Sequence, residues 1–572
     1  MIVGVMMIKL AACVFELYIP YVTEHLIDHV VPTRDAAAVI IWGFGMIMLA
    51  VMAYVLNVIG NRLSVIAAER STYRMRSDLF SAALRLSGSQ IDRIGLPSII
   101  TRMTSDSYNV QNFTRTVQTV GIRAPFVLIG GIAVTFTMDA GLASVLSIMA
   151  PILIIIVVTV SFKGVALYNG VQKCMDRLMR VMRENITGIR VVKALSREEH
   201  EKERFAGANA ETARKDISTG IVMAMPGPTV SMFLNVGFVI VVVLGSYRVN
   251  GGKTEPGVIL AFLTYFNMIL SGVRSLNNIL MKMSKANASA KRIAEVVEEP
   301  EDLVRIPESD GASTRNGDFI VFENVSFSYD SDHISADRSG FLGQERSRCL
   351  DSVSFSVPKG GSLGIIGATG SGKTSIINLL MRFYDPQEGH IFVDGRDIRT
   401  YEPDDLRGRF GTVFQNDVIF ADTIRENVDF GRNVGEGAAM LALRDAMAEE
   451  FVSSYDDGID HLSMIHGANF SGGQKQRILI ARALAADPEI LVLDDSSSAL
   501  DYRTDADLRA AIREHHGKAT SIVIAQRVSS IMSLDRIMVL DEGRIIGYGT
   551  HDELTANCPQ YREIYENQMG EV

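Results

Sequence analysis

Six long apolar runs in the first half of the chain restrict how it can fold. They lie at roughly 2–24, 38–60, 117–138, 141–162, 220–246 and 257–281. As an α-helix rising about 1.5 Å per residue, each run is long enough to cross a hydrocarbon layer of about 30 Å. Inside such a layer the backbone polar groups must be paired within the protein, so these runs predict six membrane-spanning helices. The first run has no basic segment before it and no A-x-A cleavage site, which indicates a span and not a signal peptide.

Lysines and arginines gather in two of the five loops between these runs. Eight lie between the second and third runs and twelve between the fourth and fifth, whereas the other loops hold only Arg34, Arg248 and Lys253. Because cytoplasmic loops carry the excess of basic residues, we expect both long loops and both termini in the cytoplasm. Apolar residues at three- and four-residue spacing in these loops predict helices that continue out of the membrane. We expect the tips of the two loops to contact the soluble part of the chain.

The second half of the chain has the pattern of a soluble α/β domain. Residues 298–317 are polar and contain Pro, Gly and Ser, as a linker does. After them, FIVFENVSFSY and SVSFSV alternate as strands do, while GSLGIIG and ILVLDD have the pattern of buried strands. We therefore expect a membrane domain over 1–290, a linker over 291–317 and a soluble domain over 318–572.

The run GATGSGKT at 367–374 lies between the buried strand GSLGIIG and a predicted helix that begins TSIINLL. It fits G-x-x-x-x-G-K-[ST], in which glycines let backbone N–H groups turn toward phosphate oxygens. Lys373 adds a positive charge, Thr374 offers its hydroxyl to Mg²⁺, and the helix N-terminus favours an anion. The residues predicted to bind nucleotide here are Gly367, Thr369, Gly370, Ser371, Gly372, Lys373, Thr374 and Ser375.

A second motif, NFSGGQKQR at 469–477, is followed closely by IARAL. With both motifs in one chain, the protein resembles a half-transporter of the ATP-binding cassette (ABC) exporter superfamily over nearly its whole length. It most resembles the hydrolysis-impaired subunit of bacterial heterodimeric multidrug exporters. The resemblance implies an α-helical six-span transmembrane domain followed by an α/β P-loop ABC ATPase domain, with ATP and Mg²⁺ as ligands. It also implies a second half-transporter chain, the lipid bilayer and a small amphiphilic substrate as partners.

The resemblance assigns roles to residues outside the phosphate loop. It implies that Tyr329 stacks on adenine, that Gln415 reaches Mg²⁺ and the attacking water, and that Asp494 holds Mg²⁺. The run SALD matches the D-loop and ends at Asp501, which is then expected near the nucleotide. The signature residues expected to touch the γ-phosphate of a nucleotide held by the other subunit are Ser471, Gly472, Gly473 and Gln474.

Two positions depart from family members that hydrolyse ATP well. Those members usually have Glu directly after the Walker B Asp, which is Asp494 here, whereas this chain has Asp495. They usually have His in the switch loop, which matches the run IAQR here, whereas this chain has Gln526. Asp withdraws the carboxylate by roughly 1 Å or more relative to Glu, and misplacement on that scale can cost ~10²-fold in rate. Gln526 can donate a hydrogen bond to a phosphate oxygen, but it cannot become a cation. We expect this chain's own site to bind ATP well and cleave it slowly, while its SGGQ completes a second site whose Glu and His come from a partner chain.

Three further features differ from the family pattern. Ile465 stands where a Glu usually precedes the signature, which puts a signalling role for that acid in doubt. A polar stretch at 330–349 is longer than the usual turn and is expected to be a surface insertion. The amphipathic helix that commonly precedes the first span is expected to be missing or truncated.

Polar residues in the apolar spans are candidates for the substrate path. One helical face of the sixth span carries Thr264, Asn267, Ser271, Arg274 and Asn278. In lipid such a stripe must face protein or water, so it lines a translocation cavity or bonds to other helices. Glu16, midway through the first span, attracts cationic drugs or pairs with Arg274 or another basic neighbour.

We therefore expect ATP-driven export of small amphiphilic molecules, of the multidrug type, across the cytoplasmic (inner) membrane by one half of a heterodimer. The alternatives are a homodimeric exporter of lipid or peptide, and an ATP-gated regulatory or channel subunit with little transport of its own. The net charge of −10 argues against nucleic acid as a main partner, and the six spans exclude a soluble ABC protein acting on translation or DNA. Four scattered cysteines without a C-x-x-C pair indicate reduced structural thiols.

Overall fold

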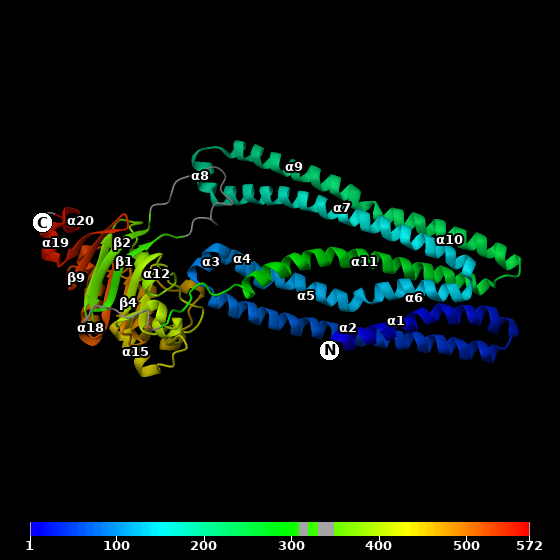
Figure 1. Ribbon diagram of the computed structural model, residues 1–572, viewed down its shortest axis with the longest axis horizontal. Coiled ribbons are helices and arrows are strands. Elements are labelled where there is room, and N and C mark those ends of the chain that lie inside the picture. Colours follow the sequence, from blue (N-terminus) through cyan, green and yellow to red (C-terminus); the bar gives the residue numbers. More distant parts are fainter. Residues whose placement is uncertain (1, 308–317, 330–347, 571–572) are drawn as a thin grey trace. The chain divides into compact units, whose positions relative to one another are not determined.

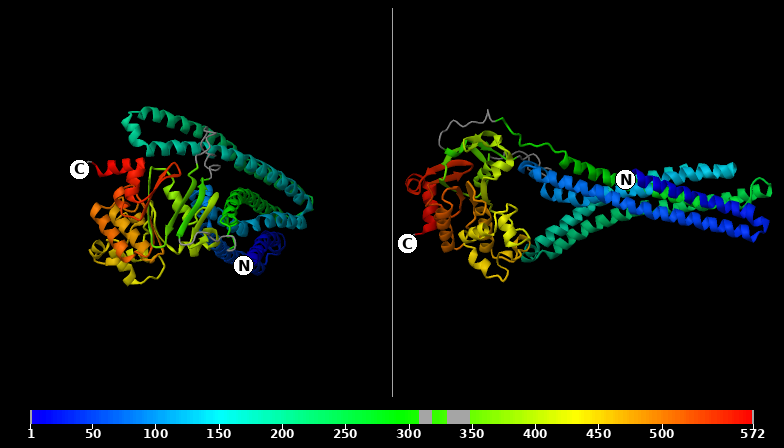
Figure 2. Two further views of the ribbon diagram at one scale, coloured as in Figure 1. Left: turned by 60° about the vertical axis from the view of Figure 1, so that its left-hand side comes forward. Right: turned by 90° about the horizontal axis from the view of Figure 1, so that it is seen from below.

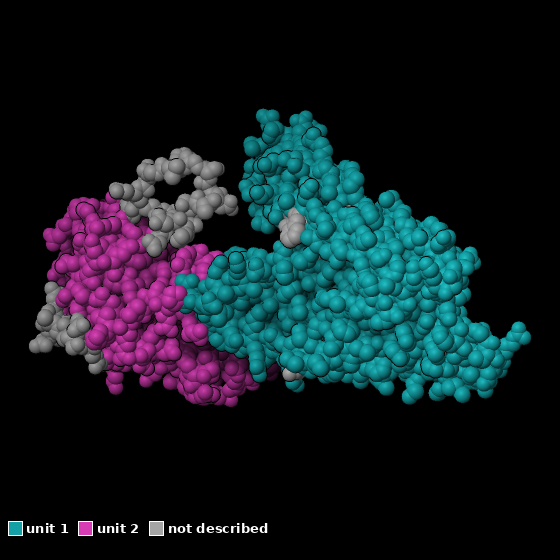
Figure 3. Space-filling model, turned by 45° about the vertical axis from the view of Figure 1, so that its right-hand side comes forward, with its two compact units in different colours: residues 1–84, 97–299 teal, residues 85–96, 300–572 magenta. Residues whose placement is uncertain are grey.

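The computed structural model describes residues 2–307, 318–329 and 348–570, which divide into two compact units (Figure 3). Unit 1 comprises Met1–Leu84 and Pro97–Glu299, and unit 2 comprises Arg85–Leu96 and Pro300–Val572. The tip of the first long basic loop is therefore part of unit 2. Most of the stretch 330–349 and part of the expected linker lie outside the described residues.

The described part of unit 1 consists of helices, and six candidate membrane spans are found among them (Figure 1). Its α-helices are α1 (Ile2–His25), α2 (Ala36–Arg85), α4 (Leu96–Thr101), α5 (Ser107–Thr116), α6 (Arg123–Met138), α7 (Ala140–Thr187), α8 (Ile189–Ala194), α9 (Glu198–Ala224), α10 (Pro226–Asn250) and α11 (Pro256–Val297). Short π-helical turns occupy Leu26–Val30, Arg102–Asp106 and Val117–Gly121, and a 3-10 turn occupies Val31–Thr33. The prediction of six spanning helices is confirmed.

Several of these helices are longer than a hydrocarbon layer requires. Helix α2 has 50 residues and α7 has 48, which at 1.5 Å per residue gives lengths of about 75 and 72 Å. The prediction that the basic loops continue as helices is confirmed. In the second of these loops, α7 and α9 lie side by side (Figures 1 and 2). Helix α9 ends at Ala224 and α10 begins at Pro226, so the helix of the fifth span is interrupted at the segment that contains Pro226 and Pro228.

The apolar core of unit 1 lies where α6, α7, α10 and α11 meet. Phe262 and Phe266 of α11 are buried there together with Leu146 of α7 and Val241 of α10. Gly237 of α10 allows this close approach, because a Cβ atom at that position would collide with the Phe266 ring. Small residues let helices pack closely in membranes, where dispersion contacts are a main source of association.

A polar network links α1, α2 and α6 within the membrane-spanning region. Lys9 is buried and donates from Nζ to Oδ1 of Asn57 (3.0 Å) and to Oδ1 of Asn61 (2.7 Å). Asn57 in turn donates to Oε1 of Glu16 (2.9 Å). The other carboxylate oxygen of Glu16 accepts from Nε of Arg123 at 3.1 Å and forms an ion pair with this guanidinium. Partners of this kind are what ionisable groups in a membrane require.

Unit 2 contains two sheets, and the larger one carries the parallel strands. The smaller sheet has the order β2-β1-β4-β5 and is antiparallel, and the larger has the order β10-β9-β3-β8-β7-β6. In the larger sheet, β10 is antiparallel to β9 and the other neighbours are parallel. The strands are β1 (Asp318–Phe327), β2 (Leu350–Pro358), β3 (Ser362–Gly367), β4 (Glu388–Val393), β5 (Arg396–Asp397), β6 (Phe410–Val413), β7 (Ile490–Asp494), β8 (Thr520–Ile524), β9 (Arg536–Asp541) and β10 (Arg544–Gly549).

The helices of unit 2 surround these sheets (Figures 1 and 2). They are α3 (Gly88–Ile94), α12 (Lys373–Leu380), α13 (Pro403–Arg407), α14 (Ile424–Asp429), α15 (Glu436–Asp445), α16 (Glu449–Ser453), α17 (Gly472–Leu484), α18 (Tyr502–His515), α19 (His551–Asn557) and α20 (Pro559–Met569). Short 3-10 turns occupy Ile398–Thr400, Gly458–Asp460, Ile465–Gly467 and Val528–Ser530.

Two apolar clusters position the two nucleotide motifs of unit 2. The first packs both sheets around α12, with Ile320, Ile365 and Ile376 fully buried. The second packs α14, α15 and α17 against β6 and β7, with Ile480 of α17 fully buried. The phosphate loop is thus held by the first cluster and the signature helix by the second. The buried strands predicted at GSLGIIG and ILVLDD are confirmed as β3 and β7.

Candidate functional site

Four neighbouring parallel strands end side by side and bring the predicted nucleotide residues together. Strand β3 leads into the phosphate loop, and its neighbour β8 leads to Gln526. Strand β7 ends at Asp494, which Asp495 follows, and β6 leads to Gln415. The carboxyl ends of parallel strands share one edge of a sheet, and ligands of open α/β sheets bind in the crevice outside that edge. Residues that lie up to about 160 positions apart in the sequence therefore form one site.

The phosphate loop wraps around the N-terminus of α12. Gly372 has a φ of +100°, and a Cβ atom there would come within 2.5 Å of the carbonyl oxygen of Cys349. Only glycine tolerates both conditions. Lys373 donates from Nζ to the carbonyl oxygens of Gly367 (2.9 Å) and Ala368 (2.8 Å). Burial lowers the pKa of Lys373, opposed by the nearby aspartates, and its charge together with the helix N-terminus suits a phosphate group.

The side chains of Thr374 and Asp494 form the candidate Mg²⁺ site. Thr374 Oγ1 donates to Oδ2 of Asp494 at 3.1 Å, and Asp494 is only 2% exposed. Burial raises the pKa of Asp494, and the neighbouring charge of Asp495 adds to the shift. The described residues contain no cluster of three His, Cys, Asp or Glu side chains that could hold a metal alone. This donor set fits Mg²⁺, which binds to one or two carboxylates and takes its remaining ligands from substrate phosphates and water.

Asp495 and Gln526 contact each other directly. Nε2 of Gln526 donates to Oδ2 of Asp495 at 2.8 Å, and Asp495 has a φ of +50°. Burial raises the pKa of Asp495, while the hydrogen bond from Gln526 and the charge of Lys373 oppose the shift. Asp495 stands at the expected position of the general base, and one of its carboxylate oxygens therefore already accepts a hydrogen bond from Gln526. Gln415, which follows β6, is exposed.

Tyr329 lies next to the first turns of α12, behind the phosphate loop. Its hydroxyl lies 3.2 Å from Oγ of Ser375 and accepts from Nδ2 of Asn378 at 3.0 Å. Its ring packs edge-on against Tyr384, with 5.1 Å between the ring centroids. These contacts fix a half-buried aromatic ring beside the first turns of α12.

The signature residues begin helix α17 and are partly exposed. Ser471 is the N-cap of α17 and forms a capping box with Gln474, which accounts for both side chains locally. Gly473 lies against the D-loop, because a Cβ atom there would be 3.2 Å from the carbonyl oxygen of Ala499. Asp501 ends the D-loop and accepts from the backbone N–H of Thr504, as the N-cap of α18.

Two side chains that the sequence did not single out hold the D-loop. Oε1 of Gln476 accepts from the backbone N–H of Ala499 at 3.0 Å, and its Nε2 donates to Ser498 Oγ at 3.3 Å. Arg527 donates to the carbonyl oxygens of Leu500 (3.4 Å) and Ser498 (3.5 Å). Both residues lie inside recognisable motifs, yet no sequence pattern indicates which backbone groups they contact.

Helix α3, from the first long basic loop, contacts the segment between α12 and β4 and residue Asp302, all within unit 2. The hydroxyl of Tyr384 donates to Oδ2 of Asp92 at 2.6 Å. Ser87 donates to Asp302 at 2.6 Å, and the backbone N–H of Gly88 donates to the carbonyl oxygen of Phe383 at 3.0 Å. The prediction that a loop tip contacts the soluble domain is confirmed for this loop. Tyr384 connects α3 with Tyr329 of the nucleotide site.

The candidate substrate residues lie in unit 1. Asn267, Ser271 and Arg274 are exposed on one face of α11, together with Thr264 and Asn278. Among the described residues, none of these five side chains has a hydrogen bond to another helix. Glu16 does have a basic neighbour, Arg123 of α6, as the polar network above describes. Sequence reasoning overlooked Lys9, although a lysine within an apolar span is a readable signal.

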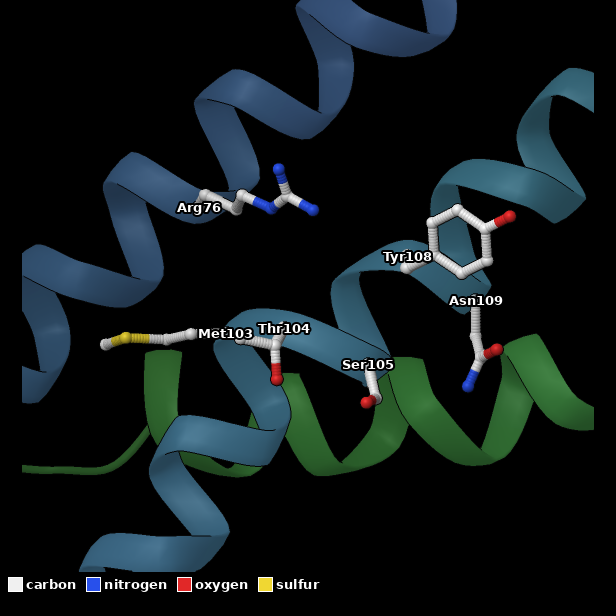
Figure 4. A pocket seen from close by; sticks show the side chains of 6 residues that line it. All are labelled: Arg76, Met103, Thr104, Ser105, Tyr108 and Asn109. Atoms are coloured by element: carbon white, nitrogen blue, oxygen red, sulfur yellow. The ribbon is translucent and has the colours of Figure 1, made fainter.

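A pocket of about 640 Å³ lies elsewhere in unit 1, between α2 and residues 103–109 (Figure 4). It is lined by Arg76, Met103, Thr104, Ser105, Tyr108 and Asn109. Tyr108 and Asn109 come from α5 and Arg76 from α2. None of the residues that the sequence singled out for substrate lines this pocket.

Comparison with known proteins agrees with this arrangement. The family model described as the ABC transporter transmembrane region matches residues 2–273, and the one described as ABC transporter matches residues 350–498. The chain is 33% identical to the uncharacterized ABC transporter ATP-binding protein YfiB of Bacillus subtilis, over 99% of this chain and 96% of that protein. It is also 33% identical to the uncharacterized ABC transporter ATP-binding protein Rv1273c of Mycobacterium tuberculosis, over 98% of this chain and 95% of that protein.

A solved structure shares the fold over the whole length. The structure of a bacterial Atm1-family ABC exporter with ATP bound covers 100% of this chain and 98% of its own, with a TM-score of 0.80 and 23% identity.

A multi-pass membrane region followed by an ABC-type ATPase domain defines an exporter-type half-transporter. The chain belongs to the ABC transporter family. Its function is therefore ATP-driven export across a membrane, and as a half-transporter it requires a second half.

Proposed function

We propose that this chain is the slow-site subunit of a heterodimeric exporter of small amphiphilic molecules. The observation that carries this proposal is the pairing of Asp495 with Gln526 at the ends of β7 and β8. A general base must lie within hydrogen-bond reach of its water before its pKa matters. Asp495 has a shorter side chain than Glu, and one of its oxygens already accepts from an amide. The pocket therefore grips a triphosphate but lacks a well-placed base.

The residues expected to bind ATP match the family pattern, whereas two residues expected to cleave it do not. This contrast supports a heterodimer in which one ATP site hydrolyses slowly and the other hydrolyses fast. The phosphate loop, Asp494 and the signature residues carry the pattern of a binding-competent ATPase, whereas Asp495 and Gln526 depart from it at the positions of the expected base and switch-loop His. The exposed N-terminus of α17 is free to complete a nucleotide site on a second chain. That second chain supplies a Glu and a His to the site where hydrolysis is fast.

The cycle that follows from this arrangement couples ATP binding to helix movement. ATP draws the two ATPase domains together, provided that it binds the closed pair more tightly than the open pair. Helix α3 transmits the movement from Tyr384 toward α2 and the spans. The basic loops, both termini and the ATPase domain lie in the cytoplasm, with the spans in the cytoplasmic membrane. We place the membrane domain at 1–290 and the nucleotide-binding domain at 318–572.

The exposed polar face of α11 supports a substrate cavity. Lipid chains offer no hydrogen-bond partners to the side chains of Asn267, Ser271 and Arg274. This face therefore lies against water, substrate or the second half-transporter. Glu16 is the second candidate residue of the cavity. Its carboxylate attracts cationic substrates while it is paired with Arg123. Transport of cationic dyes by the Glu16→Gln variant tests this role, and transport equal to that of the wild type would exclude it.

Purification of the tagged chain from its native membranes tests the heterodimer. We expect it to copurify with a different half-transporter that carries Glu and His at the positions of Asp495 and Gln526, and to drive uphill transport after reconstitution. Two copies of this chain that each turn over ATP rapidly would refute the proposal. A complex that hydrolyses ATP without uphill transport would instead support a regulatory or channel subunit.

A further inference from the structure

The last turn of α20 holds the backbone of the switch loop through one side chain. Gln568 donates from Nε2 to the carbonyl oxygen of Gln526 at 2.6 Å. Its Oε1 accepts from the backbone N–H of Val528 at 2.7 Å. A primary amide offers one donor group and one acceptor, so this side chain satisfies both backbone groups that flank Arg527.

The switch loop needs such a partner because it has left the sheet. Strand β8 ends at Ile524, and residues 525–527 precede the 3-10 turn Val528–Ser530. Arg527 is extended, with φ of −100° and ψ of 126°, so the two bonds to Gln568 resemble those of a neighbouring strand. They fix the directions in which the side chains of residues 526 and 527 leave the backbone.

Both of those side chains act at the nucleotide site. Gln526 donates to Asp495 at 2.8 Å, while Arg527 reaches the D-loop carbonyl oxygens and lies over the Tyr502 ring at 5.0 Å. A cavity of about 400 Å³ is lined by Asp495, Gln526, Arg527 and Gln568 together with Ser498 of the D-loop and residues next to these positions. Gln568 therefore forms part of the same wall as the residues that it orients.

The first turn of α20 is packed into the apolar core, so the position of its last turn is fixed relative to the sheet. Tyr561 is fully buried among Ala525, Val528 and Ile366, and its hydroxyl pairs with Nδ1 of His551 at 2.8 Å. Gln568 itself is exposed. Each of its bonds is thus in competition with water and has a modest net strength.

We propose that Gln568 is a positioning residue for the ATP site, which holds the switch loop so that Gln526 and Arg527 face the nucleotide and the D-loop. It does not touch the nucleotide. Removing it leaves the phosphate loop and the ATP-binding contacts of Lys373 intact. The rate of the chemical step changes, and the affinity for ATP does not.

Hydrogen exchange of the full-length chain in nanodiscs tests this proposal first. The amide of Val528 is the group that Gln568 protects, so the peptide containing it should exchange about fivefold faster in Gln568→Ala. Gln568→Glu keeps the acceptor but replaces the donor by a carboxylate that faces the Gln526 carbonyl oxygen, and it should also expose the loop. Asn567→Ala and Asn567→Asp are the matched controls, because the Asn567 side chain is exposed and has no hydrogen bond to the described residues.

Single-turnover hydrolysis of labelled ATP by the same preparations provides the second readout. We expect Gln568→Ala and Gln568→Glu to raise the rate at saturating ATP by about fivefold, because the released Gln526 amide no longer occupies an oxygen of Asp495. The ATP concentration for half-saturation should stay within twofold of the wild type. The melting temperature should stay within the range of the Asn567 variants. Equal exchange of the Val528 peptide in Gln568 and Asn567 variants would overturn the proposal. So would a joint change in ATP affinity and melting temperature, which would indicate a purely structural role.

Discussion

Restoring the missing catalytic pair should convert the slow site into a fast one. The variant is Asp495→Glu combined with Gln526→His in the full-length chain. Glu moves the carboxylate outward by roughly 1 Å, the scale on which misplacement costs ~10²-fold in rate. His removes the amide that donates to Asp495 at 2.8 Å and offers a group that can become a cation. We therefore expect ATP cleavage at this site to accelerate by ~10²-fold, which corresponds to about 2.7 kcal/mol in the activation barrier.

The measurement follows ATP that is retained by the protein. The complex from native membranes is loaded with labelled ATP and Mg²⁺, passed rapidly over a desalting column, and the decay of bound ATP to ADP is recorded. Wild-type protein should retain part of its nucleotide as ATP, whereas the double variant should retain ADP. The amount bound should be the same in both, because Lys373 and Thr374 are unchanged.

The control is Asp495→Asn, which keeps the length of the side chain and removes its charge. It should retain ATP for at least as long as the wild type. The reasoning is refuted if the double variant retains ATP as long as the wild type does. It is equally refuted if the wild-type chain already cleaves its ATP at the rate of the double variant.

Two further predictions concern packing. Tyr384→Phe removes the hydroxyl that donates to Asp92 at 2.6 Å; we expect amide exchange in α3 to rise by about fivefold, with ATP binding unchanged, and equal exchange would show that this bond does not hold α3. Gly237→Ala places a methyl group against the Phe266 ring, and overpacking of this kind destabilises by about 1–3 kcal/mol. The melting temperature in detergent should fall for Gly237→Ala but not for Gly227→Ala, which has no atom within 4 Å of the added methyl group; an equal response of both variants would contradict the packing assigned to α10.

The sequence by itself determined the class of fold and predicted most residues of the candidate ATP site. Apolar runs longer than a hydrocarbon layer leave the backbone no alternative to helices, so the six spans were readable without coordinates. The phosphate loop was equally readable, because glycines such as Gly372 are required by a φ of +100° and by a close carbonyl oxygen. Asp495 and Gln526 also stood out, since they replace residue types with a known chemical task.

Only the tertiary structure decided which side chains hold that site in place. Gln568 and Gln526 are 42 positions apart, and Tyr384 and Asp92 are 292 apart. Their contacts depend on how α20 and α3 pack, and neither helix carries a local pattern that indicates its neighbour. Glu16 shows the same limit, because its charge was visible in the sequence while its partner Arg123 on α6 was not. Local periodicity and motif chemistry act over a few residues, whereas these pairings follow from the packing of elements far apart in the chain.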